Sequence, residues 1–445
     1  MTKINRAALQ SLTTWKNDTK RKPLILLGAR QVGKSYLLRE FGRESYQKCH
    51  IFDFEIDSKL GEIFEGDLNP NRILRDLSLY SGERIDINKD LVVFDEIQAC
   101  GRALTSLKYF SEQLGELHLI STGSLLGVLL NNDNSFPVGK VTLLDLAPLS
   151  FSEFAEARTG SGLITEVAEA FAEARPISVA AHMRLTEELR LYTLTGGLPE
   201  VVASTLGKRH LNFDDVQEIR SIQKNLITSY LADMAKHCGS VNSMHLERLW
   251  RNVPQQLARG VDGTSNKFVF KDVIPGIKGY ERLIGPLDWL AKARIILKVP
   301  IVENALLPLS SQTHENTFKL YLFDVGLLNA MLNTDPLALL NDNLEITKGY
   351  IYENFAAQEL STKIPEQIFC WRNKESEVDF LIDHKGELLP IEIKAGRRIR
   401  ARSLTVFCKR YHPSKLAILS MNNLDLSSAS EMRFPVYLSS RVVGA

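Results

Sequence analysis

Short apolar runs alternate with amphipathic stretches over the first 149 residues. The runs are continuous or strictly alternating, as in strands of a buried parallel sheet, and the stretches between them have helical spacing. The expected strands are residues 24–27, 49–54, 91–94, 118–124 and 141–146, and the expected helices are residues 36–41, 57–83 and 104–114. This repeated strand–helix succession predicts a doubly wound α/β domain over residues 1–149.

The pattern changes from residue 150 onward. Helical spacing over residues 151–157, 163–174, 182–194 and 214–236, interrupted by glycine and proline, predicts a helical lid over residues 150–236. Residues 237–335 are mostly helical but contain two strand-like pieces, 294–299 and 319–323, the outline of a winged-helix module. Residues 336–445 return to a mixed α/β pattern and are expected to form an end domain.

The first chemical motif directly follows the first expected strand. Residues 28–35 read G-A-R-Q-V-G-K-S, a complete phosphate-binding loop between a strand and a helix. Its backbone N–H groups can surround phosphate oxygens, Lys34 can reach the β- and γ-phosphates, and the Ser35 hydroxyl can ligate Mg²⁺. The residues expected to bind nucleotide here are Gly28, Arg30, Gln31, Val32, Gly33, Lys34, Ser35 and Tyr36.

A second motif, L-V-V-F-D-E at residues 91–96, matches a Walker B strand. Asp95 is expected to hold Mg²⁺, and Glu96 is expected to act as the general base toward water. The run H-L-I-S-T-G-S at residues 118–124 fits the extra strand that some ATPases place between the two motifs. Thr122 or Ser124 would then sense the γ-phosphate, and the alternative for Ser124 is a helix N-cap. Together the motifs predict ATP and Mg²⁺ as cofactors.

The third informative region is a predicted hairpin near the C-terminus. Residues 377–383 and 388–394 alternate apolar and polar positions, and a loop over residues 384–387 would set Asp379 across from Glu392. Lys394 lies on the same face as Glu392, and Glu353 on the preceding helix could complete an acidic set. Such a cluster can hold a divalent metal at Glu353, Asp379 and Glu392, although a hairpin with charges on its solvent face is the alternative.

A basic run follows the hairpin. Its residues are Arg397, Arg398, Arg400 and Arg402, followed by Lys409 and Arg410. Beside a phosphodiester site the run could hold a nucleic-acid backbone, and a solvated charged surface is the alternative.

Composition restricts these possibilities. The 445 residues fit two to four domains, and 44% hydrophobic and 24% charged residues are ordinary for a soluble chain. A net charge of +1 means that any basic surface must be local. The five cysteines form no C-x-x-C pair, so neither a disulfide framework nor a zinc site is supported. We find no signal-peptide-like segment and no apolar stretch long enough to span a bilayer, and we therefore expect a cytoplasmic protein without a membrane partner.

With these motifs in order, the chain resembles prokaryotic AAA+-class P-loop ATPases that carry a C-terminal domain of unknown function. Besides the P-loop and Walker B pieces, the resemblance rests on L-A-P-L-S-F-S-E-F, T-G-G-L-P-E, F-D-V-G-L-L and Y-E-N-F-A-A-Q-E-L. The Asp379, Glu392 and Lys394 arrangement resembles the PD-(D/E)XK nuclease core. The resemblance implies ATP binding, a lid, a winged helix and a nuclease-like end domain. Family members usually have Gly-Arg where this chain has Gly139-Lys140, so no arginine finger is assigned.

The leading hypothesis is a Mg²⁺-dependent ATPase whose nucleotide state controls a DNA-directed C-terminal module. Glu96 and Lys34 would serve ATP hydrolysis, and Asp379, Glu392 and Lys394 would serve any cleavage. DNA contact is expected through the basic run and the winged helix, with a second copy or another protein as a further partner. The alternative is an ATP-dependent switch or scaffold whose end domain docks a partner without cleaving nucleic acid. A third hypothesis is a DNA-binding regulator without turnover.

Overall fold

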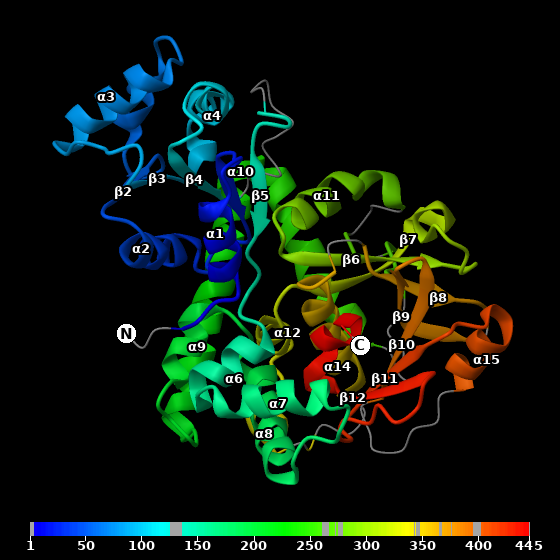
Figure 1. Cartoon of the computed structure of the whole chain (residues 1–445). Coiled ribbons are helices and arrows are strands. Elements are labelled where there is room, and N and C mark those ends of the chain that lie inside the picture. Colours follow the sequence, from blue (N-terminus) through cyan, green and yellow to red (C-terminus); the bar gives the residue numbers. More distant parts are fainter. Residues whose placement is uncertain are drawn as a thin grey trace. The chain divides into compact units, whose positions relative to one another are not determined.

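The computed structural model divides the chain into two compact units. It describes residues 4–124, 136–259, 267–271, 273–274, 279–341, 343, 348–364, 367–374, 376–394 and 402–444, without the side chains of residues 237–241. The N-terminal unit comprises residues 5–147 and 292–294, and the C-terminal unit comprises the described residues of 148–291 and 295–445. Figure 1 labels elements of both units.

A five-stranded parallel sheet forms the centre of the N-terminal unit. Its strands are β1 (Leu24–Leu27), β2 (Cys49–Asp53), β3 (Leu91–Asp95), β4 (His118–Gly123) and β5 (Thr142–Asp145), in the order β2-β3-β4-β1-β5. The predicted insertion is confirmed, because β4 lies between the strand of the P-loop and the strand of the Walker B motif. Since all five strands are parallel, their carboxyl ends share one edge, where ligands of such sheets bind.

Helices and an aromatic cluster complete the N-terminal unit. The helices are α1 (Ala8–Asn17), α2 (Lys34–Ser45), α3 (Pro70–Ser81) and α4 (Gly101–Gln113), with 3-10 turns η1 (Ser58–Phe64) and η2 (Ile97–Ala99). Phe94 of β3 is fully buried and meets Phe52, Phe54, Phe64 and Phe110 edge-on. Such edge-to-face contacts stabilise beyond area burial alone, so they anchor the strand that carries Asp95.

The C-terminal unit begins with a run of helices and has further helices between its strands. Its helices are α6 (Phe151–Thr159), α7 (Gly162–Ala172), α8 (Val179–Thr195), α9 (Pro199–Thr205), α10 (Phe213–Ala258), α11 (Ile284–Lys292), α12 (Val325–Met331), α13 (Pro336–Leu340), α14 (Lys348–Ser361) and α15 (Arg402–Tyr411), with 3-10 turns η3 (Tyr280–Arg282), η4 (Leu309–Gln312) and η6 (Val436–Gly444). Helix α10 begins with a capping box between Asn212 and Asp215. It continues for 46 residues, so the boundary expected at residue 236 falls inside a continuous helix.

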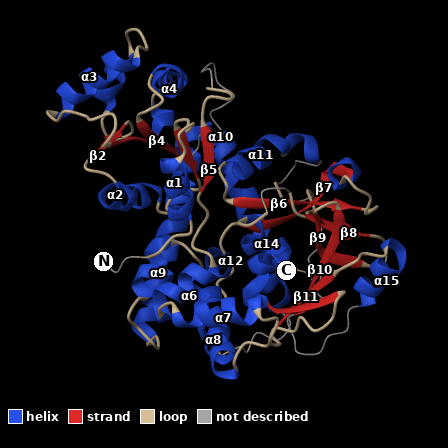
Figure 2. Ribbon diagram, viewed as in Figure 1, coloured by secondary structure: helices blue, strands red, loops and turns tan. Residues whose placement is uncertain are grey.

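A seven-stranded mixed sheet forms the rest of this unit, and Figure 2 shows its strands in red. The strands are β6 (Ile296–Val302), β7 (Thr313–Leu322), β8 (Phe369–Arg372), β9 (Glu377–His384), β10 (Glu387–Lys394), β11 (Leu416–Ser420) and β12 (Glu431–Pro435), in the order β12-β11-β10-β9-β8-β6-β7. Strands β6 and β7, which contain the two strand-like pieces, pair antiparallel. However, β6 also pairs with β8, so the presumed winged-helix strands extend the sheet of the end domain. The buried residues of β6 explain this placement, because an internal strand needs apolar side chains on both faces.

A group of buried polar side chains joins α14 to the helical part of the unit. We call Tyr192, Asp324, Gln358 and Glu359 the α14 network. Gln358 donates through Nε2 to the Tyr192 hydroxyl at 2.7 Å, and its Oε1 accepts from the N–H of Val325 at 3.0 Å. Glu359 Oε1 accepts from the N–H of Phe151 at 2.9 Å. Buried backbone donors are thereby satisfied by side chains rather than by water.

Asp324 ties two glycine-containing segments into the same network. Its carboxylate accepts the N–H of Gly197 at 2.7 Å and the N–H of Leu327 at 2.9 Å. The close approach requires glycine, because a Cβ on Gly326 would collide with the backbone of Thr195. Several motifs that carry the family resemblance therefore meet in one buried structural contact.

Gly326→Ala should destabilise the protein by about 3 kcal/mol or more, because the added methyl group must displace backbone atoms in a close-packed interior. Gly285→Ala is the matched control, since Gly285 also lies in the first turn of a helix but a Cβ there meets nothing within 4 Å. The control should be neutral or stabilising by up to about 1 kcal/mol. Urea denaturation followed by circular dichroism would measure both, and equal midpoints for the two variants would contradict the packing argument.

Burial raises the pKa of Glu359 to about 7. Between about pH 4.5 and pH 7 the unfolded carboxyl group is ionised while the folded one keeps its proton, so stability should fall as the pH rises through this window. The loss approaches roughly 3 kcal/mol for this group. Asp324, whose pKa burial raises to about 6, contributes in the same direction.

Glu359→Gln should flatten the decline in denaturation midpoint between pH 5 and pH 7.5, because the amide cannot ionise. Exposed Glu281→Gln is the control and should keep the wild-type slope. Parallel slopes for wild type and Glu359→Gln would show that Glu359 titrates normally.

Candidate functional site

The P-loop connects β1 to α2 and has the backbone geometry that its glycines allow. Gln31 and Gly33 both lie in the left-handed region, with φ of 63° and 91°. Gly33 is the N-cap of α2, so the N-terminal end of that helix faces the loop. A Cβ on Gly28 would collide with the carbonyl oxygen of Leu146, so only glycine allows this approach to the end of β5.

Lys34, the first residue of α2, is buried beneath this loop. Its Nζ donates to the carbonyl oxygens of Gly28 at 3.0 Å and Ala29 at 2.9 Å. Burial lowers the pKa of Lys34 to about 8, and the nearby Glu96 and Asp95 oppose that shift. The ammonium therefore lies in a desolvated position where a phosphate would stabilise its charge.

One threonine contacts both residues of the Walker B pair. Asp95 ends β3 and is buried, and Thr122 donates its hydroxyl hydrogen to Asp95 Oδ1. The same hydroxyl oxygen accepts from the N–H of Glu96 at 3.0 Å. Ser124 donates to Glu96 Oε2 at 3.1 Å. Thr122 and Ser124 thus both contact the Walker B pair, and the helix that Ser124 was considered to cap lies outside the described residues.

Gln98 is a further contact of Glu96 that the sequence analysis did not single out. Its Nε2 donates to Glu96 Oε2, the same oxygen that accepts from Ser124. Glu96 itself has a left-handed φ of 49°, which is uncommon outside glycine and is found at functional sites. The position of Gln98 two residues after Glu96 was visible in the sequence, but its side-chain direction depends on this turn.

The other residues predicted to bind nucleotide lie in the loop itself or in the first turn of α2. Arg30 pairs with Glu55 at 2.8 Å, Val32 is buried, and Tyr36 is exposed on α2. Ser35, the predicted Mg²⁺ ligand, lies next to Lys34 in the first turn of α2. Lys140, at the position where relatives usually have arginine, pairs with Glu112 at 2.9 Å.

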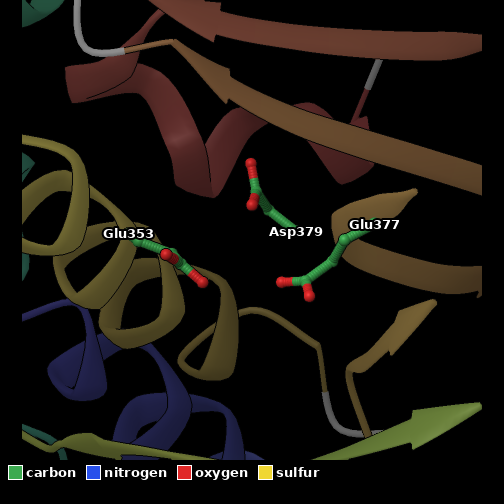
Figure 3. A group of neighbouring side chains, drawn as sticks. All are labelled: Glu353, Glu377 and Asp379. Atoms are coloured by element: carbon green, nitrogen blue, oxygen red, sulfur yellow. The ribbon is translucent and has the colours of Figure 1, made fainter. Parts of the chain in front are cut away.

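An acidic cluster lies on the second sheet. Glu353 on α14 and Glu377 and Asp379 on β9 each offer a carboxylate oxygen within 4.8 Å of the others. Figure 3 shows Glu353 directed from the helix toward the space beside the two strand residues. Alternation along β9 places Glu377 and Asp379 on one face, as the sequence predicted.

The hairpin between β9 and β10 has the expected register. Its last ladder pair, Ile391 with Phe380, puts Glu392 opposite Asp379 at the next step. Lys394 Nζ lies 2.5 Å from Glu392 Oε1, whereas the buried Glu392 Oε2 has no hydrogen-bond partner among the described residues. Burial, together with the charges of Glu392 and Glu353, raises the pKa of Asp379 well above its usual value.

Two cluster residues were missed because they come from β7, which the sequence pattern assigned to another module. Lys319 is fully buried and its Nζ contacts Glu353 Oε1 at 2.8 Å and also Glu377. Tyr321 donates its hydroxyl hydrogen to the same Glu353 oxygen. Burial alone would lower the pKa of Lys319, but the acidic groups around it raise that pKa well above its usual value. In the sequence, the alternation K-L-Y at residues 319–321 indicated that Lys319 and Tyr321 share one face of a strand.

Most of the predicted basic run lies outside the described residues, namely Arg397, Arg398 and Arg400. Arg402 begins α15, and Lys409 and Arg410 lie in its last turn. Arg410 donates to Asn304 Oδ1 at 3.1 Å. The described part therefore provides basic side chains on one short helix.

Family comparisons match three separate stretches of the chain. Residues 20–155 match the model of an AAA domain. Residues 186–338 and 348–438 match two models described as domains of unknown function, DUF8612 and DUF4143. The first match, the strand order and the two nucleotide motifs define the N-terminal unit as a P-loop ATPase domain of the AAA+ fold.

Solved structures with similarity to the chain include an Orc1 protein and a RuvB protein. The Aeropyrum pernix Orc1 protein, solved with DNA, is 12% identical, with 75% of this chain and 92% of that chain covered and a TM-score of 0.29. The Thermotoga maritima RuvB Holliday junction branch migration motor is 15% identical, with 67% and 90% covered and a TM-score of 0.32. The comparison with curated proteins found no match.

Within the described part of the chain, no helix is both long enough and apolar enough to cross a membrane.

Proposed function

We propose that this protein is a Mg²⁺-dependent ATPase whose nucleotide state controls a DNA-directed C-terminal module. The observation that carries the ATPase proposal is the position of Thr122. Its hydroxyl contacts both Asp95 and the backbone of Glu96, on the strand adjacent to the P-loop strand. Thr122 therefore lies on the strand that pairs with the P-loop strand, and it contacts the residues expected to bind metal and activate water.

The residues of the N-terminal unit fit ATP and Mg²⁺. The loop is tight enough to exclude a Cβ at Gly28, and the buried ammonium of Lys34 has only backbone carbonyls as direct partners among the described contacts. Ser35 and Asp95 would hold Mg²⁺, which neutralises phosphate charge when bound. Glu96, oriented by Ser124 and Gln98, would accept a proton from the attacking water.

Glu96→Gln should reduce ATP hydrolysis by about 100-fold or more while ATP still binds, because the amide cannot accept a proton. Lys34→Ala should abolish tight ATP binding, since the phosphate loses its main cationic partner. Phosphate release and fluorescent-nucleotide binding would separate the two effects. Exposed Glu62→Gln is the control and should match wild type. Wild-type hydrolysis by Glu96→Gln would place the base elsewhere.

The DNA-directed part of the proposal rests on the acidic cluster. The elements α14, β8, β9, β10, α15 and β11 follow one another along the chain, the order expected for a nuclease-like core. All candidate ligands are carboxylate oxygens, which suit Mg²⁺ or Mn²⁺, and the orphaned Glu392 Oε2 could accept such an ion. Glu353, Asp379 and Glu392 would hold the metal, and Lys394 would steady developing negative charge. A bound metal would activate water there.

A second candidate is a docking module without cleavage, and the buried Lys319 favours it. Its ammonium already compensates Glu353 and Glu377, and Lys394 already pairs with Glu392. In this version the cluster is a structural ion-pair network, and ATP controls the binding of a partner. The two candidates differ in whether the cluster takes up a divalent metal.

Asp379→Asn should weaken Mn²⁺ binding at the cluster by about tenfold or more, because an anionic ligand is lost. Asp383→Asn is the matched control on the same strand, since its exposed side chain lies outside the cluster and accepts from the N–H of Gly386. Calorimetric titration of the nucleotide-free protein, with Asp95→Asn in both backgrounds, would isolate the cluster from the P-loop.

Cleavage of single- and double-stranded DNA with Mn²⁺, with and without ATP, would then separate the two candidates. Metal binding followed by cleavage that Asp379→Asn removes would support the nuclease-like function. Absence of metal binding at the cluster would favour the docking module.

A further inference from the structure

A cavity of about 410 Å³ lies in the helical part of the C-terminal unit. Its walls come from α6, α7, α8 and the connection between α9 and α10, all of which belong to this unit (Figure 1). Among the described residues, the lining includes no acidic side chain and four basic ones, namely Arg158, Arg184, Lys208 and Arg209. Pockets for small ligands have volumes of roughly 300–1,000 Å³, so this cavity, which we call the basic cavity, is large enough for a small anion.

A buried carboxylate on α8 holds two of the four basic residues. Glu188 Oε2 accepts from Arg158 Nε at 2.7 Å, and Glu188 Oε1 pairs with Arg184 Nη2 at 2.6 Å. Since two guanidinium groups share one negative charge, this group of three side chains as a whole is positively charged. Arg184 also pairs with Glu187, but the Glu187 side chain is 57% exposed, so water screens that pair.

Arg158 stabilises one wall of the basic cavity. Its side chain is 2% exposed, and its Nη1 and Nη2 donate to the carbonyl oxygens of Thr205 at 2.5 Å and Lys208 at 2.9 Å. These bonds join α6 to the connection that follows α9. Gly207 in this connection has a φ of 77°, a turn conformation that glycine adopts without strain. Arg158 therefore positions the backbone that carries Lys208 and Arg209.

Arg209 differs from the other basic residues of the cavity because it has no internal partner. It is exposed, and within the described part of the chain its side chain forms no ion pair and no hydrogen bond. Lys208, by contrast, pairs with Asp215 at 2.7 Å and with Glu218 at 3.4 Å. A guanidinium without an internal partner, in the same cavity as a positively charged group of side chains, attracts an anion from solution.

We propose that the basic cavity binds a small molecule that carries phosphate groups, at a site made by the C-terminal unit alone. Arginine presents several N–H donors in a fixed plane, which match phosphate oxygens bidentately. A phosphate group offers up to about two negative charges and three acceptor oxygens, so it can accept from Arg184 and Arg209 together. Leu163 of α7 supplies an apolar surface for the rest of the ligand. The site is additional to the proposed nucleotide site, because none of its residues belongs to the nucleotide motifs.

Calorimetric titration of the full-length Lys34→Ala variant with inorganic pyrophosphate tests this proposal, because that background lacks the main cation of the P-loop. We expect a single saturable site. Adding Arg209→Ala should weaken pyrophosphate binding by about tenfold or more, since a charge-assisted contact is lost. Exposed Arg282→Ala in the same background is the control for loss of an arginine charge and should keep the parental affinity. Circular dichroism would verify that each variant is folded.

Succinate, a small dicarboxylate, tests the class of ligand. It should bind the Lys34→Ala variant at least about tenfold more weakly than pyrophosphate, because each carboxylate has less charge and fewer acceptor oxygens than a phosphate group. Equal affinity for the two anions would overturn the assignment to phosphate. Equal pyrophosphate affinities of the Arg209→Ala and Arg282→Ala variants, or loss of all pyrophosphate binding in Lys34→Ala alone, would overturn the site. Because the test is made without a functional P-loop, its result does not depend on ATP binding.

Discussion

The C-terminal unit depends on the buried polar contacts of helix α14. Gln358 and Glu359 satisfy backbone N–H groups at the starts of α12 and α6, where no helical partner exists. On the preceding turn, Asn354 donates to and accepts from the backbone of Leu322 at 3.0 and 2.8 Å. Because β7 is the edge of its sheet, this amide pairs with a backbone that lacks a neighbouring strand on that side.

The same helix also carries Glu353, so the geometry of the acidic cluster depends on these structural contacts. Glu353 is adjacent to Asn354, and its carboxylate is held by Lys319 and Tyr321 of β7. A shift of α14 would therefore disturb backbone pairing and the acidic cluster together. This coupling explains why a helix described only as part of a domain of unknown function contains so many buried polar residues.

In the N-terminal unit a comparable constraint comes from close backbone approach. Gly28 packs against the carbonyl oxygen of Leu146 at the end of β5, and Thr122 joins the ends of β4 and β3. Contacts that fix a loop before a ligand arrives lower the entropic cost of binding phosphate. The half-buried Arg294 pairs with Asp145 at the end of β5 and adds positive charge from a different part of the chain.

The local features could be predicted from the amino-acid sequence. The strands of the first sheet, the P-loop, the Walker B pair and the facing of Asp379 and Glu392 all follow from periodicity and short spacing, since each depends on neighbours in the chain or on a tight hairpin. Tertiary structure decided which strands share the second sheet, because the pairing of β6 with β8 joins segments far apart in sequence. It also decided the places of Lys319 and Arg294, whose partners are set by long-range packing that no local pattern encodes.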